Sequence, residues 1–177
     1  MRSDKITASS WEALSLSAFA PFGDVIEAGA GRSFAINDGT TIRHEGLADI
    51  DVGAGGCPVV SIFESRPFGF PLTVRVMERH PLSSQAFIPM QPKPYFVVVA
   101  PPGDRVDASS IRVFLARGDQ GVNYRSGVWH HAAVVIEPMA FLVLDRGTQE
   151  PNCDFFHLPD DATGPVLDWP GDAPAVG

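Results

Sequence analysis

One stretch of the chain, in which an apolar strand runs into ionisable residues and a turn, decides how the fold is interpreted. It reads Met77-Glu78-Arg79-His80-Pro81-Leu82-Ser83-Ser84-Gln85-Ala86-Phe87-Ile88-Pro89-Met90. An acid, a base and an imidazole follow directly on apolar residues, and burying such groups costs desolvation energy. We therefore expect either chemistry or a structural ion pair at this strand end.

The residues that lead into this stretch, 72–80, alternate as a single β-strand would. Three aliphatic residues share one face with Glu78 and His80, whereas Arg79 falls on the opposite face. Glu78 and His80 are therefore expected to point inward, into a cavity or a buried ion pair.

A second stretch, further along the chain, complements the first. It reads Gly118-Asp119-Gln120-Gly121-Val122-Asn123-Tyr124-Arg125-Ser126-Gly127-Val128-Trp129-His130-His131. Residues 128–136 are expected to form one strand, in which His130 shares a face with Val134 and His131 takes the other face. Only one of the two histidines then faces a given cavity. We interpret the two stretches as the two walls of one site.

The rest of the chain predicts an all-β protein. About ten short strands are separated by Pro and Gly turns, and one short helix is expected over residues 15–20, with Ser15 as its N-cap. An Asn-Asp-Gly turn should follow a strand at residue 36. Several strands are apolar on both faces, which predicts a double sheet or a dimer interface over the outer face. Residues 1–158 form the expected domain, and residues 159–177, rich in Pro, Gly, Asp and Ala, a tail.

Composition limits the classes of function. The 177 residues suit one domain, and 45% hydrophobic with 19% charged residues indicates a globular chain. Thirteen basic against 21 acidic residues give a net charge of −8, which argues against nucleic acid and anionic membranes as partners. No apolar run reaches ~18 residues, so no membrane span is expected. The N-terminus has no apolar core of a signal peptide, which predicts a cytoplasmic protein.

The two cysteines, Cys57 and Cys153, have no Cys-x-x-Cys spacing, which argues against a thiolate zinc site. Without an export signal we expect buried free thiols rather than a disulfide.

The candidate site residues each have an alternative, purely structural interpretation. Glu78 and His80 suit an acid–base pair or metal ligands, or a buried pair with a neighbouring arginine. His130 suits a base or ligand from the second wall, or a core histidine. Gln85 shares parity with Phe87 and is either a site amide or a turn residue. Two further residues, Tyr124 and Arg125, either contact the substrate or are ordinary loop residues.

A divalent metal is a further possibility. Glu78, His80 and His130 offer three donors, with Gln85 as a weak fourth, which is enough for a loosely held ion with open positions. The sequence has no His-x-His pair.

The two stretches resemble the ureidoglycolate lyase family, also called ureidoglycolate hydrolases. The resemblance extends over roughly residues 14 to 158 and includes shorter matches at residues 22–27, 36–39, 72–73, 145–147 and 152–154. It implies a cupin-like jelly-roll β-barrel, a homodimer, and cleavage of (S)-ureidoglycolate to glyoxylate and urea in the use of allantoin as a nitrogen source. It also implies nickel as the associated metal.

The chemistry that the resemblance implies fits these residues. Ureidoglycolate carries a hydroxyl and a ureido group on one carbon beside a carboxylate, so elimination needs a base for the hydroxyl proton and an acid for the departing nitrogen. Glu78, His80 and His130 are the catalytic candidates, in roles that spacing does not assign. The carboxylate needs a cation, Arg79 or a metal ion. The hydrogen-bonding candidates are Gln85, Asn123 and Tyr124.

Two other classes of function are compatible with the sequence. One is an amidohydrolase that releases ammonia from ureidoglycolate, for which a metal-activated water would serve. The other is a non-catalytic cupin that binds a small carboxylate as a sensor. Product identity separates the first from the lyase, and binding without turnover would mark the second.

Overall fold

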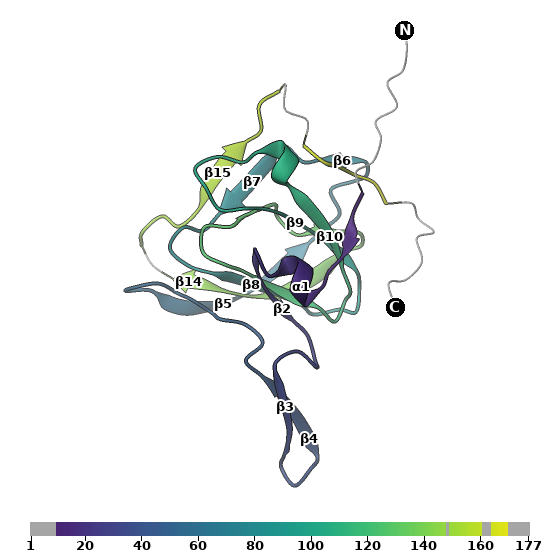
Figure 1. The fold of residues 1–177 in the computed structure, drawn as a ribbon, viewed down its shortest axis with the longest axis vertical. Helices are drawn as coiled ribbons and strands as arrows, with labels where there is room; N and C mark the ends of the chain where they lie inside the picture. Colours follow the sequence, from purple (N-terminus) through teal and green to yellow (C-terminus); the bar gives the residue numbers. More distant parts are fainter. Residues whose placement is uncertain (1–9, 148, 161–163, 170–177) are drawn as a thin grey trace.

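The structure is a computed structural model that describes residues 10–147, 149–160 and 164–169. The described residues form two main β-sheets (Figure 1). The larger sheet contains, in spatial order, β1 (Glu12–Ala13), β10 (Arg112–Ala116), β9 (Tyr95–Ala100), β12 (Trp129–His130), β7 (Val76–Arg79) and β15 (Asp154–His157), with β13 (Val134–Val135) also paired to β9. The smaller contains β2 (Gly23–Ile26), β11 (Gly121–Tyr124), β8 (Gln85–Pro89), β14 (Met139–Gly147) and β5 (Cys57–Ser65). The expected all-β double sheet of cupin-like type is confirmed.

Two small sheets and two short helical turns complete the fold. β16 (Val166–Leu167) pairs with β6 (Leu72–Thr73), and β3 (Arg32–Ile36) pairs with β4 (Thr41–Glu45). The helix expected near the N-terminus is a single turn, α1 (Leu16–Phe19), in which the Ser15 hydroxyl accepts a hydrogen bond from the Ala18 amide. A 3₁₀ turn, η1 (Ala108–Ser110), precedes β10.

The strand β9 has apolar side chains on both faces because each face contributes to a different core. Tyr95, Val97 and Val99 pack between the two main sheets, against residues of β8, β11 and β14. The alternate residues of β9, Phe96 and Val98, pack on the outer side of the larger sheet, where N-terminal and C-terminal segments cover them. The outer face of the larger sheet is therefore buried within the chain itself.

Part of the expected tail, residues 164–169, contributes to this outer core. Val166 and Leu167 are buried, and Trp169 meets Phe96 edge to face. Residues 164–169 are thus packed rather than loose, because the apolar outer face of β9 needs cover. The remaining residues of the expected tail, apart from 159–160, lie outside the described residues.

The strand expected over residues 128–136 is wrong in one respect, because it divides into β12 and β13. From His130 to Val134 the chain advances four residues while its partner β9 advances three, from Val99 to Phe96. One extra residue therefore forms a bulge. Because of this bulge, the side chains of β13 point to the opposite sides of the sheet from those expected for an uninterrupted strand. His130 lies on the inner side, whereas Val134 packs in the outer core.

The strand expected over residues 72–80 is likewise interrupted, after Thr73. Val74 and Met77 both pack in the outer core although their positions differ in parity. Their shared orientation follows from the break between β6 and β7. Alternation does hold within β7.

The cysteines are free, as expected, but both are exposed rather than buried. The Cys57 thiol lies 3.1 Å from the Gly147 carbonyl oxygen at the edge of the smaller sheet.

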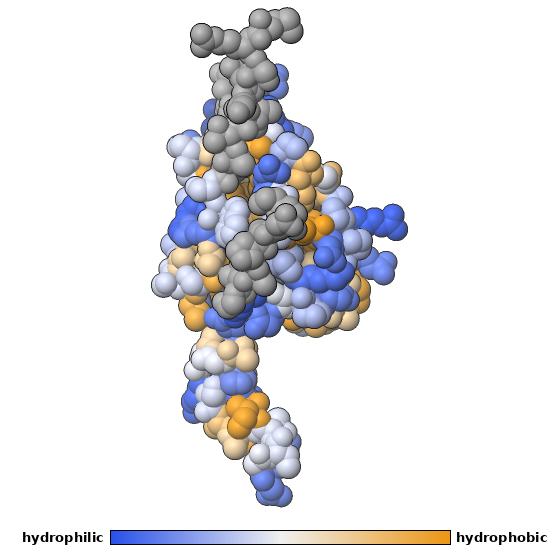
Figure 2. All heavy atoms as spheres, turned by 90° about the vertical axis from the view of Figure 1, so that its right-hand side faces the viewer, coloured by the Kyte–Doolittle hydropathy of each residue, from blue (hydrophilic) through white to orange (hydrophobic). Residues whose placement is uncertain are grey.

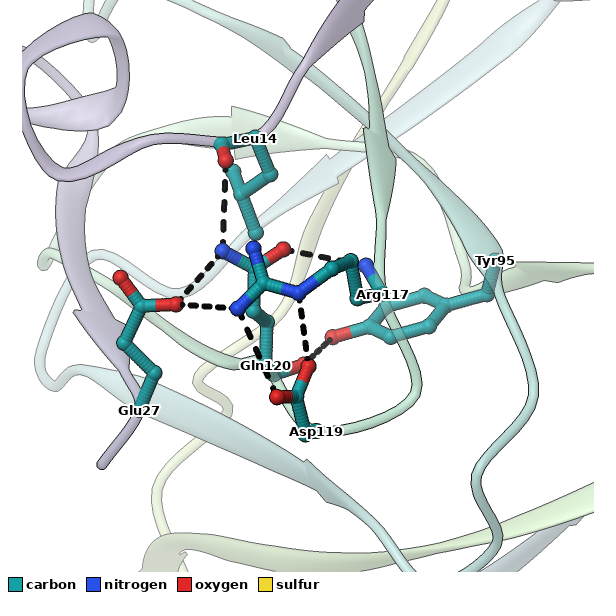
Figure 3. Close-up of polar contacts among 6 residues, drawn as sticks. All are labelled: Leu14, Glu27, Tyr95, Arg117, Asp119 and Gln120. Carbon is teal, nitrogen blue, oxygen red and sulfur yellow. Dashed lines mark hydrogen bonds and ion pairs between the residues drawn. The ribbon is translucent and has the colours of Figure 1, made fainter. Parts of the chain in front are cut away.

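A buried amide joins the N-terminal segment to the turn before β11 (Figure 3). The Gln120 amide nitrogen donates to the Leu14 carbonyl (3.2 Å) and to Glu27 (2.8 Å), while its amide oxygen accepts from the Arg117 backbone (3.0 Å). The Tyr95 hydroxyl donates to the Gln120 carbonyl at 2.8 Å. These contacts fix the turn from which the second site wall begins.

The β3–β4 hairpin projects from the body (Figures 1 and 2). Asn37 and Asp38 have φ of 52° and 54° at its tip, as the expected Asn-Asp-Gly turn requires. In the part of the chain that the structure describes, no helix has the length and apolar character needed to cross a membrane.

Candidate active site

The structure brings the two stretches together through paired strands. β12 pairs with β7 so that His130 stands directly opposite Glu78, and β11 pairs with β8. His80 follows immediately after β7. One ligand atom from each of Glu78, His80 and His130 lies within 4.8 Å of the other two. The Nε2 atom of His130 is 3.5 Å from a Glu78 carboxylate oxygen.

Backbone carbonyls fix the orientation of both imidazoles. The Nδ1 atom of His80 is 2.6 Å from the Asn152 carbonyl oxygen, and that of His130 is 3.2 Å from the Val128 carbonyl oxygen. Because a carbonyl oxygen only accepts, Nδ1 carries the proton in each ring, and Nε2 of a neutral ring has a free lone pair. Both Nε2 atoms are buried without a hydrogen-bond partner in the described chain.

The ring of Tyr124 holds His130 from the second wall. The two rings stack at a centroid distance of 4.1 Å with an interplanar angle of 7°. Tyr124 lies on the inner face of β11 and also contacts Phe87 edge to face. Burial raises the pKa of the Tyr124 hydroxyl, so this group stays protonated and can donate a hydrogen bond.

The charges of the cluster are set by proximity and burial. The pKa of Glu78 is lowered mainly by the hydrogen bond that the His130 ring donates when it is protonated on Nε2, although burial opposes this shift. Burial is the main cause that lowers the pKa of His130, and Glu78 partly offsets it. An ionised carboxylate therefore stands beside a neutral imidazole at neutral pH.

This arrangement fits a divalent metal ion. Two imidazole lone pairs and a carboxylate converge with no proton donor between them, which is unfavourable unless a cation shares the space. The carbonyl partners of both Nδ1 atoms are the kind of support that metal-binding histidines have. Glu78, His80 and His130 would hold such an ion and leave positions open for a substrate.

A cleft of about 180 Å³ opens beside Glu78. It has mostly apolar walls, and the described residues that line it are Phe63, Ser65, Arg66, Phe68, Glu78, Phe87, Ala132 and Ala133. Of the three cluster residues, Glu78 is the one that reaches this cleft, with 24% of its side chain exposed against 1% for His130.

Gln85 lies at the start of β8, on the same strand face as Phe87. It is buried, and its amide nitrogen is 3.5 Å from an Asp145 carboxylate oxygen. Its amide oxygen has no hydrogen-bond partner among the described residues. Gln85 therefore lies on the inner face of β8, and its amide oxygen can accept a hydrogen bond from a ligand.

Three other expected site residues lie outside the cluster. Arg79 faces the other side of β7, where it pairs with Asp154 at 2.9 Å and covers the Trp129 ring. Asn123 points to the outer side of β11 and donates to Asp24 at 2.9 Å. Arg125 lies 3.5 Å from the Ala20 carbonyl oxygen, in a different pocket.

Sequence reasoning missed two contributors to the site. Asn152 orients His80, and Arg66 lines the cleft. Both lie in loops, where alternation gives no information. The nearest available signal was the match at residues 152–154, to which no role was assigned.

The chain is similar to known proteins over most of its length. A sequence model of the family described as Ureidoglycolate lyase matches residues 6–163. Proteins named ureidoglycolate lyase from Azotobacter vinelandii and Burkholderia cepacia are 50% and 52% identical to this chain. The alignments cover 81% of this chain in both cases, and 87% and 82% of the relatives. A relative of the same name from Pseudomonas entomophila is 46% identical, over 85% of this chain and 91% of its own length. Since the family model matches residues 6–163 and relatives of about 50% identity align with most of its length, the chain belongs to the ureidoglycolate lyase family.

Proposed function

We propose that this protein is a lyase that cleaves (S)-ureidoglycolate to glyoxylate and urea in allantoin degradation, a part of purine catabolism. The observation that carries the proposal is the convergence of Glu78, His80 and His130, with Glu78 opening onto a small cleft, in a chain of this family. The substrate would be a small molecule, and the net charge of −8 supports neither nucleic acid nor an anionic membrane as partner. A cytoplasmic location is part of the proposal.

In the proposed mechanism Glu78 moves the proton. Its lowered pKa keeps the carboxylate ionised, and it is the cluster residue that reaches the cleft. The carboxylate takes the proton of the substrate hydroxyl, and the carbon–oxygen bond becomes the carbonyl of glyoxylate. The carbon–nitrogen bond breaks with its electron pair on the ureido nitrogen, to which Glu78 returns the proton, giving urea.

A divalent ion, with nickel as the candidate, would be held by Glu78, His80 and His130. When bound it supplies a Lewis acid that polarises a substrate oxygen. Tyr124 keeps the His130 ring in position, and its protonated hydroxyl and the Gln85 amide provide hydrogen bonds for the polar substrate. Arg79 and Asn123 act at a distance, by fixing β7 and β11 through Asp154 and Asp24.

The test is a product assay with racemic ureidoglycolate, before and after chelator treatment, that follows glyoxylate, urea and ammonia together. Equal amounts of glyoxylate and urea above the spontaneous rate would support the lyase. Ammonia in place of urea would indicate the amidohydrolase, and ligand binding without turnover the non-catalytic cupin. Chelator sensitivity that nickel reverses would support the metal.

Variants connect the activity to the cluster. Glu78→Gln removes the proton acceptor with little change in shape, and His130→Ala removes a ligand. Each should lower kcat by about 10²–10⁴-fold, the range for acid–base groups. His157→Ala, which changes an exposed histidine on β15, should leave the rate unchanged. Full activity in Glu78→Gln would exclude the proposed proton transfer.

We also propose a homodimer formed through the outer face of the smaller sheet. On this face β5 exposes Val60 and Ile62, at 63% and 53%, and it is an edge strand whose outer edge has no partner in the described chain. Leu142 and Leu144 stand opposite them on β14. Exposed apolar side chains on an open edge strand favour pairing with a second copy.

Light scattering after size-exclusion chromatography tests the dimer. The wild type should elute as a dimer, and a Val60→Asp/Ile62→Asp variant as a monomer. Ile42→Asp, which changes an equally exposed apolar residue on the hairpin (58% exposed), should leave the dimer intact. Dissociation by Ile42→Asp alone would assign the interface to the hairpin instead.

A further inference from the structure

The expected cation for the substrate carboxylate is not available to the cleft. Arg79 donates to Asp154 at 2.9 Å and to the Gly103 carbonyl at 2.6 Å, and its guanidinium lies 4.6 Å from the Trp129 ring centroid. These contacts hold the guanidinium on the opposite face of β7 from the cleft. A substrate carboxylate would therefore need another partner, in addition to any metal ion.

Arg66 is placed to be that partner. It follows the last residue of β5, Ser65, and precedes Pro67, whose ring fixes the backbone of the loop. It lines the cleft beside Glu78 and is exposed, whereas Glu78 is mostly buried. No ion pair or hydrogen bond of Arg66 occurs within the described chain, so its guanidinium is available to a ligand.

The walls of the cleft strengthen this role. Apart from Ser65, the uncharged lining residues are Phe63, Phe68, Phe87, Ala132 and Ala133. Charges interact more strongly beside apolar walls than in bulk water. The two charged lining residues, Arg66 and Glu78, have opposite signs, so an anionic group in the cleft is attracted by Arg66 and repelled by Glu78.

We propose that the exposed Arg66 binds the carboxylate of the substrate in the cleft and so directs the reacting carbon toward Glu78. This rests on the proposed lyase function for the identity of the substrate. The recognition itself, of a small 2-hydroxy carboxylate, does not depend on turnover. A guanidinium suits this task because it can form two parallel hydrogen bonds with a carboxylate.

The experiment compares glycolate with its uncharged amide, glycolamide, by titration calorimetry on the protein as purified. The wild type should bind glycolate more tightly. In Arg66→Gln the affinity for glycolate should fall by about 10- to 100-fold, the range for a hydrogen bond to a charged group, while that for glycolamide stays unchanged. Arg66→Lys should restore part of the preference. Arg43→Gln, an exposed arginine on the hairpin, should behave as the wild type.

Three results would overturn the proposal: no binding of glycolate by the wild type, an unchanged preference in Arg66→Gln, or an equal loss of both ligands. Steady-state kinetics with ureidoglycolate then separates the failure of the Arg66 proposal from the failure of the proposed lyase function. Loss of carboxylate preference in Arg66→Gln without turnover by the wild type would reject the lyase and keep the role of Arg66. Turnover of ureidoglycolate that is the same in the wild type and in Arg66→Gln would keep the lyase function and reject the role of Arg66.

Discussion

The stacked ring of Tyr124 is the contact that most directly sets the position of His130. Burial keeps that imidazole neutral, and its Nδ1 atom faces the Val128 carbonyl, but neither feature fixes the tilt of the ring. A parallel ring at 4.1 Å does so. The aromatic surface and the hydroxyl of Tyr124 should therefore have separable roles.

Tyr124→Phe keeps the ring and Tyr124→Leu removes it. We expect Tyr124→Phe to bind nickel as the wild type does but to have a raised KM, because it lacks the hydroxyl. Tyr124→Leu should lose about 10- to 100-fold in nickel affinity, as for other residues that support metal ligands. Calorimetry and steady-state kinetics measure the two effects. Equal nickel affinity in all three proteins would show that the stack does not position His130.

Asn152 supports His80 through its main chain and the turn through its side chain. Its amide oxygen accepts from the Leu82 amide and its amide nitrogen donates to the Ser83 hydroxyl, both at 2.8 Å. Asn152→Ala should lower the free energy of unfolding by about 1–3 kcal/mol and weaken nickel binding, because a backbone amide loses its partner. Asn152→Asp keeps the hydrogen-bond acceptor, so its free energy of unfolding should lie between those of the wild type and Asn152→Ala. Urea denaturation and calorimetry provide the measurements, and a destabilised variant with unaltered nickel affinity would dissociate the two roles.

At this scale the sequence predicted the residues that lie on regular strands. Alternation within β7 placed Glu78 inward and Arg79 outward, and β7 keeps that alternation. The sequence named Asn123 and Tyr124 together as hydrogen-bonding candidates, and only Tyr124 stands beside His130, because adjacent residues of β11 face opposite ways. Arg66 and Asn152 were not predicted because loop residues reach a site through folds of the backbone that a local pattern does not encode.

Among the elements, the turn before β11 depends on one buried amide. Gln120→Ala would leave the Leu14 carbonyl and the Arg117 amide without their partners, so we expect a loss of about 2–4 kcal/mol in the free energy of unfolding. Gln120→Glu should also destabilise, because it places a second carboxylate against Glu27. Gln149→Ala, an exposed position, should stay within about 0.5 kcal/mol of the wild type. A neutral Gln120→Ala would mean that the network is incidental.

The bulge between β12 and β13 shows where pattern reasoning fails for elements. Val134 and Val135 are both buried, in different cores, and both are valines. The sequence is therefore equally compatible with either facing, and only the pairing with β9 decides between them. Composition and turn residues were sufficient for the fold class, because they do not depend on register.

For the molecule as a whole, a bound ion should stabilise the folded state, because the three ligands converge only there. At about 100 times its dissociation constant, nickel would add about 2.7 kcal/mol. For a chain of this length that corresponds to a rise in Tm of about 5–10 °C. His80→Ala should abolish the rise and His157→Ala should retain it, in differential scanning fluorimetry. An identical rise in His80→Ala would place the ion elsewhere.

The direct pairing of His130 with Glu78 makes the activity of a protein preparation sensitive to the register of β7. If β7 paired one step out of place, Met77 or Arg79 would stand opposite His130, and the acid would point to the wrong side of the sheet. A compact molecule with that error would lack activity. Specific activity, measured per mole of total protein, should therefore report the fraction of molecules that have folded in the correct register.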